Sequence, residues 1–185
     1  MTLAGIFVGG SGTRMGGVAK GLLAAPGGAG TLIDRWRSVL GEAGIDRVVL
    51  VGRHPAYARV EGLETIDDEP PGIGPLGGLV ALLRRAGDAT ALAFACDMPF
   101  VSRGLVERLV AAAPAPVVAP RREGRWEPLC ARYDATRVLP LAMRAAAGPR
   151  HGVGRVLDEA GAVELPLGPG EAAELDDWDS PADQR

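Results

Sequence analysis

The chain has 185 residues, of which 47% are hydrophobic, so it can bury one sizeable core and gives no reason to expect disorder or a second domain. Its formal net charge of −3 argues against general nucleic-acid binding, which needs a basic footprint, so a phosphate-rich ligand must be met by a few placed cations. No apolar run approaches the ~18 residues that span a membrane, and the N-terminus lacks a cleavable leader pattern, so we expect a cytoplasmic protein without a membrane partner.

The first part of the sequence alternates short apolar runs with stretches of helical periodicity. The apolar runs predict strands at residues 3–8, 47–51, 62–66 and 90–96. A capping box at 31–34 precedes one predicted helix, apolar residues repeat with helical spacing over 76–83, and Ser102 can cap a third helix. This order predicts an α/β fold, a Rossmann-like three-layer α/β/α arrangement around a mostly parallel sheet.

Beyond about residue 115 the alternation is less regular. Strands are predicted at 116–119 and 128–133, and helices at 135–146 and 153–159. No linker or internal repeat interrupts the sequence, so we predict a single domain over residues 1–185. The basic residues of this part are adjacent rather than patterned, which favours solvated surface charge over an acceptor site. They are Arg121, Arg122, Arg125, Arg150, His151 and Arg155.

A glycine-rich segment with two cations follows the first predicted strand. It reads Gly9-Gly10-Ser11-Gly12-Thr13-Arg14-Met15-Gly16-Gly17-Val18-Ala19-Lys20. It is not a Walker A loop, and the dinucleotide fingerprint fails because Met15 stands where its third glycine belongs. Glycines let backbone N–H groups approach phosphates closely, and Arg14 and Lys20 supply positive charge; a flexible loop with solvated cations is the alternative. The predicted phosphate-binding residues are Gly9, Gly10, Gly12, Arg14, Gly16 and Lys20.

An aspartate stands where the fourth predicted strand ends. In an open α/β sheet, ligands bind beyond the carboxyl ends of the strands, which is where Asp97 falls. Mg²⁺ is commonly held by one or two carboxylates together with substrate phosphates, so one well-placed aspartate is sufficient. Asp97 is therefore the predicted metal ligand, with a simple turn cap as the alternative.

Two further segments are candidates for the same edge. Residues 67–78 form an acidic turn that enters a helix through Gly77 and Gly78, each of which weakens a helix by about 1 kcal/mol relative to alanine. Close approach to a nucleobase or ribose explains such glycines, and tight packing of the helix on the sheet is the alternative. The acidic segment 175–181 either adds a second metal-facing carboxylate or is a solvated tail.

Taken in order, three motifs resemble the MobA-type molybdenum cofactor guanylyltransferases of the nucleotidyltransferase superfamily. The motifs are the glycine-rich segment with Lys20-Gly21-Leu22-Leu23, Gly74-Pro75-Leu76-Gly77-Gly78, and Cys96-Asp97-Met98-Pro99-Phe100. Trp178-Asp179-Ser180-Pro181 is similar to the family's closing N-x-N-T-P segment, although Asp177 and Asp179 replace its asparagines. Val51-Gly52-Arg53-His54 also departs from the family, which often carries an asparagine there.

The resemblance implies transfer of GMP from GTP to the phosphate of a molybdopterin acceptor, with Mg²⁺ as cofactor and pyrophosphate as product. It implies the nucleotide-diphospho-sugar transferase type of fold, with a nucleotide-binding half at about 1–112 and an acceptor-side half at about 113–185. Arg14, Lys20 and Asp97 are then the catalytic residues, and Asp68, Gly77 and Gly78 lie at the nucleoside end. A cofactor handed between enzymes also implies transient contact with other cofactor-biosynthesis proteins.

Two other functions fit the residues. A cytidylyl- or sugar-1-phosphate nucleotidyltransferase of the same superfamily keeps the chemistry and changes the substrates. A nucleotide-binding regulatory module keeps the fold without turnover, but it has little need of Arg14, Lys20 and Asp97 together.

Overall fold

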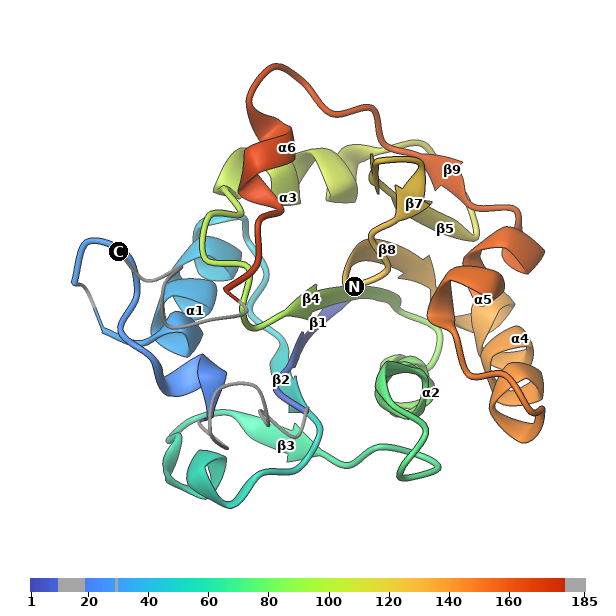
Figure 1. Ribbon diagram of the computed structural model, residues 1–185, viewed down its shortest axis with the longest axis horizontal. Coiled ribbons are helices and arrows are strands. Elements are labelled where there is room, and N and C mark those ends of the chain that lie inside the picture. The colour runs from blue at the N-terminus through green and yellow to red at the C-terminus, as the bar shows by residue number, and fades with distance from the viewer. Residues whose placement is uncertain (10–18, 29, 179–185) are drawn as a thin grey trace.

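The computed structural model describes residues 1–9, 19–28 and 30–178, and a seven-stranded sheet runs through its centre (Figure 1). The strand order is β3-β2-β1-β4-β8-β5-β9. Strand β8 is antiparallel to both of its neighbours, whereas the other neighbouring pairs are parallel. The predicted mostly parallel sheet is thus confirmed. The strands are β1 Thr2–Phe7, β2 Val48–Val51, β3 Glu64–Ile66, β4 Thr90–Ala95, β5 Val117–Ala119, β8 Cys130–Asp134 and β9 Val163–Glu164.

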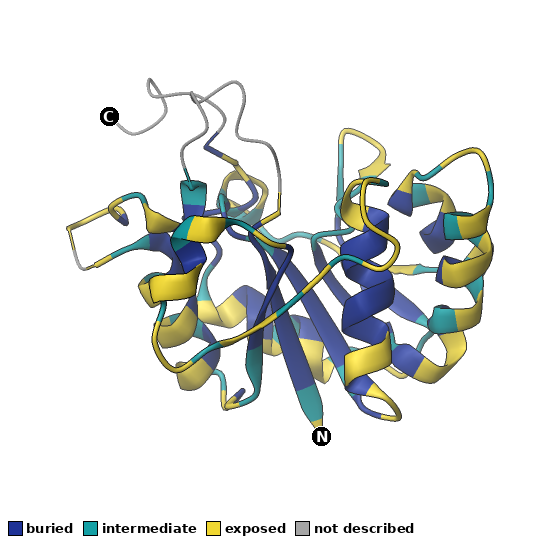
Figure 2. Ribbon diagram, turned by 90° about the horizontal axis from the view of Figure 1, so that it is seen from below, coloured by how far each residue is buried: buried dark blue, intermediate teal, exposed yellow. Residues whose placement is uncertain are grey.

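Helices cover both faces of the sheet, which gives the three layers predicted from the sequence. Alternate side chains of a strand point to opposite faces. In β1, Leu3 and Phe7 join the core cluster under one set of helices, while Ala4 and Ile6 join the other cluster. Figure 2 shows the buried strands between these layers. The first set is α2 Pro75–Ala86, α4 Ala135–Ala147 and α5 Val153–Ala160, and the second is α1 Leu32–Glu42 and α3 Arg103–Ala111.

The predicted helix starts are present with their capping hydrogen bonds. The Thr31 side chain accepts a hydrogen bond from the Asp34 N–H, and the Thr31 N–H donates to the Asp34 carboxylate, so the capping box is complete. The Ser102 side chain accepts from the Leu105 N–H at the start of α3. Both helices therefore begin at the residues that the sequence predicts.

Several short elements carry too few residues for a periodic signal, and the sequence does not predict them. They are the 3₁₀ turns η2 Lys20–Leu22 and η3 Pro55–Arg59, the strands β6 Arg121–Arg122 and β7 Arg125–Trp126, which pair with each other, strand β9 and the one-turn helix α6 Glu171–Glu174. In the described part of the chain, none of the helices has the length and apolar character that crossing a membrane requires. Among the short elements, η2 carries Lys20, one of the predicted catalytic residues.

Candidate functional site

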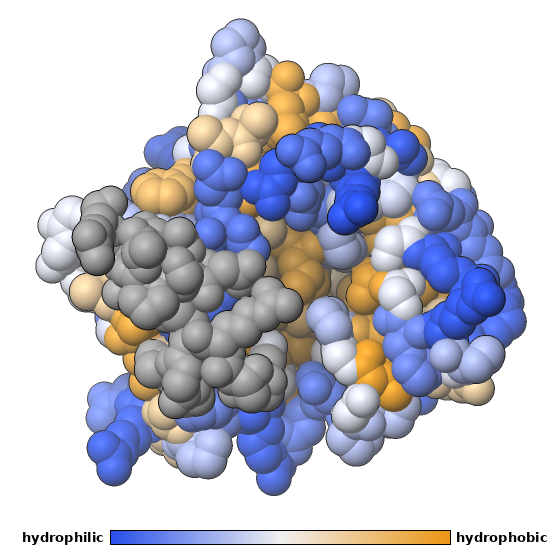
Figure 3. Space-filling view, viewed as in Figure 1, coloured by the Kyte–Doolittle hydropathy of each residue, from blue (hydrophilic) through white to orange (hydrophobic). Residues whose placement is uncertain are grey.

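The carboxyl ends of the four parallel strands β3, β2, β1 and β4 meet at one edge of the sheet. The register pairs Phe7 with both Val51 and Ala95, and Val51 with Ile66, so the residues that follow these strands share that edge. These residues are Gly9, Gly52, Asp68 and Asp97. Figure 3 looks onto this edge and shows a hollow near its centre, with apolar residues on its floor. The predicted convergence of the strand ends is therefore observed for Gly9, Asp68 and Asp97.

The structure joins two of the predicted catalytic residues directly. The Lys20 ammonium lies 2.7 Å from one carboxylate oxygen of Asp97, and the two side chains are 19% and 20% exposed. The alternative of a plain turn cap for Asp97 is not observed among the described residues, since the hydrogen bond to its carboxylate comes from Lys20. The site thus holds an ammonium and a carboxylate side by side, 77 residues apart in the chain.

Asp68 lies at the same edge, but its surroundings differ. No hydrogen bond or ion pair to its carboxylate is found among the described residues, and three glycines, Gly9, Gly52 and Gly78, lie close to it. Burial raises the pKa of Asp68 above its ordinary value, and the charge of the adjacent Asp67 adds to this rise. Asp67 itself is ion-paired with Arg53. An acceptor at this edge of the sheet can take hydrogen bonds from a ligand.

Gly77 and Gly78 are explained by packing. A Cβ atom on Gly77 would lie 2.3 Å from the Pro70 carbonyl oxygen, and one on Gly78 would lie 2.8 Å from the side chains of both Phe7 and Val51. At Gly78, helix α2 therefore approaches the sheet more closely than any other residue would allow, and at Gly77 it approaches the preceding loop in the same way. This is the packing alternative that the sequence left open, while contact with a nucleoside at these residues stays a prediction.

The acidic C-terminal segment reaches the site by its backbone. The Trp178 N–H donates a 2.9 Å hydrogen bond to the Asp97 carbonyl oxygen, and the Trp178 side chain is only 6% exposed. Asp176 forms an ion pair with Arg122. The described part of this segment is therefore not a solvated tail. Asp179 lies outside the described residues, and a second metal-facing carboxylate from this segment stays a prediction. The sequence indicated the segment but not the tryptophan contact, because an acidic pattern says nothing about which backbone groups pair.

The remaining predicted phosphate contacts also lie outside the described residues. They are Gly10, Gly12, Arg14 and Gly16. Of the glycine-rich segment, the structure describes Gly9 at its start and Lys20 at its end. The Gly9 N–H donates to the Val51 carbonyl oxygen at 3.2 Å, so the segment leaves β1 from a point anchored on β2.

The donor set fits a magnesium ion that is held mainly by phosphates. Within residues 1–9, 19–28 and 30–178, no three His, Cys, Asp or Glu side chains gather closely enough to form a metal site by themselves. Asp97 supplies one carboxylate, of which one oxygen receives the Lys20 ammonium. Mg²⁺ commonly binds through one or two carboxylates plus substrate phosphates, so Asp97 is a sufficient protein ligand.

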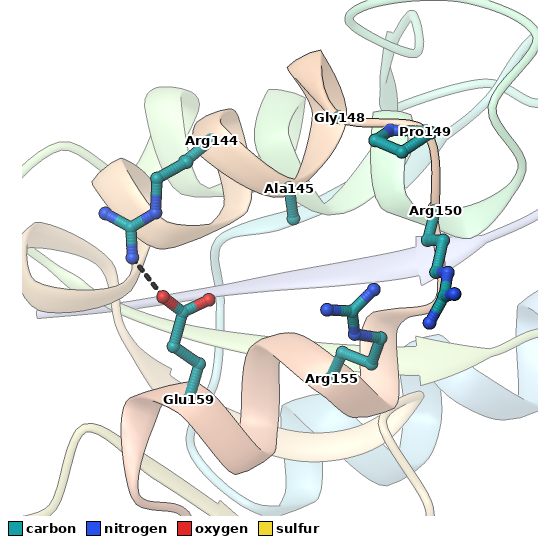
Figure 4. Close-up of a pocket in the computed structure, with 7 residues that line it drawn as sticks. All are labelled: Arg144, Ala145, Gly148, Pro149, Arg150, Arg155 and Glu159. Atoms are coloured by element: carbon teal, nitrogen blue, oxygen red, sulfur yellow. Dashed lines mark hydrogen bonds and ion pairs between the residues drawn. The ribbon is translucent and has the colours of Figure 1, made fainter.

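The basic residues of the second half do not form one cluster. Arg121, Arg122 and Arg125 lie on the paired strands β6 and β7. Arg150 and Arg155 line a separate cavity of about 210 Å³ between α4 and α5, where Arg144 is ion-paired with Glu159 (Figure 4). The predicted interpretation as surface charge fits Arg150 and Arg155, whose side chains are exposed. This cavity is lined by Arg144, Ala145, Gly148, Pro149, Arg150, Arg155 and Glu159 and shares no residue with the edge that carries Asp97.

Comparisons with known proteins identify the family of the chain. The family model described as "MobA-like NTP transferase domain" matches residues 4–163. A molybdenum cofactor guanylyltransferase from Xanthomonas euvesicatoria is 35% identical over 148 residues, which are 78% of this chain and 72% of that protein. Another from Pseudomonas putida is 36% identical over 149 residues, or 78% of this chain and 76% of that one.

Solved structures give the same picture for the fold. The molybdopterin-guanine dinucleotide biosynthesis protein A from Archaeoglobus fulgidus superposes with a TM-score of 0.79 at 26% identity, covering 100% of this chain and 95% of that one. The 2-C-methyl-D-erythritol 4-phosphate cytidylyltransferase from Thermus thermophilus has a TM-score of 0.68 at 16% identity, covering 100% and 96%. The second likeness supports the fold alone.

Proposed function

Because this chain belongs to the MobA-like NTP transferase family and is therefore a nucleotidyltransferase, we propose that it transfers GMP from GTP to the phosphate of a molybdopterin acceptor. The products are the guanine dinucleotide form of the cofactor and pyrophosphate. The relatives named above carry this activity in their names. We place the reaction in the cytoplasm, as the sequence predicts.

The observation that carries the proposal is the pairing of Lys20 with Asp97 at the carboxyl edge of the sheet. An ammonium and a carboxylate held side by side can serve two different requirements of nucleotidyl transfer. The ammonium compensates the charge of the phosphates, and the carboxylate holds a divalent cation against them. Both groups are largely buried, so their charges act with less screening by water than on an open surface.

The reaction is a single displacement at the α-phosphorus of GTP. An oxygen of the acceptor phosphate forms the new bond to that phosphorus, and the bond to the bridging oxygen of the β-phosphate breaks, so pyrophosphate leaves with the bonding electron pair. No covalent intermediate with the protein is needed, because the protein contributes positioning and charge neutralisation. Bound Mg²⁺ supplies further neutralisation of the phosphate charge, with Asp97 as its protein ligand.

Each predicted site residue has a role in this scheme. Lys20 neutralises charge beside the α-phosphate, and Arg14, together with the amides of the glycine-rich segment, holds the β- and γ-phosphates. Asp68 lies at the nucleoside end, where its carboxylate accepts hydrogen bonds from the guanosine. Gly78 keeps α2 close to the sheet, and Gly77 keeps it close to the preceding loop. Both lie beside Asp68, so we assign them to the same end through their packing.

Pyrophosphate release from each of the four NTPs, with Mg²⁺ and a phosphorylated molybdopterin acceptor, tests the proposal. We expect release that is selective for GTP and dependent on the acceptor. Asp97→Ala should lower turnover by about 10²-fold, since a preorganised charge is lost at the reacting centre. Asp88→Ala is the matched control, because Asp88 is an exposed carboxylate in the turn that precedes β4, at the opposite end of that strand.

Each alternative has its own outcome in this assay. Release with CTP, or only with another phosphorylated acceptor, would keep the reaction class and replace the proposed substrates. Tight GTP binding without release under any acceptor would favour a regulatory module. Near-normal turnover in Asp97→Ala would overturn the role of the ion pair.

A further inference from the structure

We propose that Tyr57 is a positioning residue for Lys20, and that it acts through the main-chain N–H of Gly21. The Gly21 N–H donates a 3.0 Å hydrogen bond to the Tyr57 hydroxyl oxygen, which comes from a turn 36 residues further along the chain. Gly21 is the immediate neighbour of Lys20 in η2. The hydroxyl therefore holds the backbone from which the Lys20 side chain extends to Asp97.

Turn η2 needs such a partner because its own sequence supplies none. The first N–H groups of a helical turn have no acceptor within the turn. The N-cap position of η2 is Ala19, which has no side-chain acceptor, and no capping hydrogen bond is formed there. Tyr57 takes the place of a cap, although it is remote in sequence. Removing its hydroxyl leaves the N–H of Gly21, a buried residue, without this acceptor.

Tyr57 is itself held firmly. It is 2% exposed and lies in η3, where the His54 side chain accepts a hydrogen bond from the Ala56 N–H at the start of the turn. The His54 and Tyr57 rings meet edge to face with their centroids 5.7 Å apart. Because the phenol is rigidly packed, its hydrogen bond fixes the position of the Gly21 backbone.

The fit between Tyr57 and η2 leaves little room for movement. A Cβ atom at Gly21 would lie 3.1 Å from the Tyr57 hydroxyl oxygen and 3.1 Å from Ile33. Burial raises the pKa of Tyr57 well above its usual range, and the nearby Cys96 and Asp97 add to this rise, so the phenol stays neutral and serves as an acceptor. Tyr57 therefore adds no charge beside the phosphates, where the charged groups are Lys20 and Asp97.

The composition of the chain offers a direct readout. Lys20 is the only lysine in the sequence, and Tyr57 and Tyr133 are the only tyrosines. Protein labelled with ¹³C at the lysine Cε position therefore gives one signal, which reports the surroundings of Lys20. Tyr133 is an equally buried control, whose hydroxyl donates a 2.7 Å hydrogen bond to the Pro128 carbonyl oxygen.

The experiment compares Tyr57→Phe with Tyr133→Phe in the full chain. Each change deletes one buried hydroxyl hydrogen bond, so both variants should lose melting temperature to a similar degree. We expect the chemical shift of the Lys20 signal to change in Tyr57→Phe alone. Turnover with GTP and acceptor should fall roughly 10-fold in Tyr57→Phe, with KM for GTP within about twofold of the parent, because misplacing a charged group affects chemistry more than binding.

The proposal is overturned if Tyr57→Phe leaves the Lys20 signal unchanged, or if Tyr133→Phe changes it as much. Should Tyr57→Phe not fold, 3-fluorotyrosine in the Tyr133→Phe background weakens the Tyr57 acceptor without altering its shape, and the same readouts apply. The turnover prediction rests on the proposed function, but the lysine signal does not. Normal turnover in Lys20→Met would refute the proposed role of Lys20, whereas the signal would still decide whether Tyr57 positions it.

Discussion

At one end of the candidate site the Lys20 ammonium and the Asp97 carboxylate lie 2.7 Å apart, whereas at the other end the Asp68 carboxylate has no hydrogen-bond or ion-pair partner among the described residues. The first arrangement compensates two partly buried charges before any ligand arrives. In the second arrangement no described residue compensates the Asp68 charge, and burial raises the pKa of this carboxyl. Lys20 and Asp97 can therefore serve the reaction while they compensate each other's charge. Asp68, by contrast, is retained at a cost to the stability of the folded protein.

The difference gives opposite expectations for the two ends. Removing either partner of the pair takes away a charge that compensates the other partly buried charge, so activity and stability should both fall. Removing the charge of Asp68 relieves an unfavourable burial, so stability should rise even where function is lost. Substitutions at the pair, at the glycines and at Asp68 test this contrast.

The largest effect is expected at the pair. Lys20→Met and Asp97→Asn should each lower turnover by about 10²-fold, because each removes a preorganised charge from the reacting centre. Steady-state pyrophosphate release with GTP and acceptor measures this effect. Lys20→Arg keeps the charge but replaces a compact ammonium by a planar guanidinium, so it should recover only part of the loss.

The double variant sharpens the same test. Residues that act as a unit are not additive, so Lys20→Met together with Asp97→Asn should lose little more than the worse single variant. Losses that multiply to about 10⁴-fold would mean that the two side chains act independently. The proposal that the ion pair acts as a unit in the reaction would then be wrong.

The next effect concerns the glycines beside Asp68. Gly77→Ala should destabilise the fold by about 1–3 kcal/mol, because the new methyl group meets a backbone carbonyl oxygen that cannot move freely. Gly41→Ala is the matched control, since Gly41 lies in α1 with open space around it and alanine favours a helix by up to about 1 kcal/mol. Denaturant unfolding compares the two. If Gly77→Ala is as stable as the parent, packing does not explain Gly77, and contact with the ligand becomes the better explanation.

The two ends also differ in how much of them the sequence could predict. Asp97 follows a buried strand, and Lys20 ends the glycine-rich segment after another. Because both patterns are strong, the topology of a parallel sheet predicts that the two residues lie at its carboxyl edge. The parallel half of the sheet is predictable for the same reason. Apolar runs of four to six residues, such as Val48–Val51, alternate there with capped amphipathic helices.

What the sequence could not predict depends on contacts between distant backbone groups. The Tyr57 hydroxyl receives the Gly21 N–H, and the Trp178 N–H reaches the Asp97 carbonyl oxygen. Neither contact has a local spacing rule, because each joins short irregular segments whose positions are set by tertiary packing. The same holds for β9 and the paired strands β6 and β7, whose two residues each are too few to show a period.

The smallest effect is the dependence of stability on pH at Asp68. Its folded pKa is raised by burial, so the folded state favours the protonated carboxyl, and the stability associated with that form is lost as the pH rises through the folded pKa. Asp68→Asn keeps the shape and removes the charge. At pH 7 it should therefore melt at a higher temperature than the parent.

The advantage of Asp68→Asn should shrink as the pH falls, and it should vanish below about pH 4, the ordinary pKa of an aspartate, where the parent carboxyl is protonated in the unfolded chain as well. Thermal melts between pH 3 and pH 7 measure the difference, and Asp88→Asn, which alters an exposed carboxylate, should show no comparable trend. A variant less stable than the parent at pH 7 would mean that the Asp68 charge is compensated in the folded protein. The contrast between the paired and the unpaired end of the site would then fail, whereas a stabilised variant with a higher KM for GTP would mark Asp68 as a charge retained for the nucleotide.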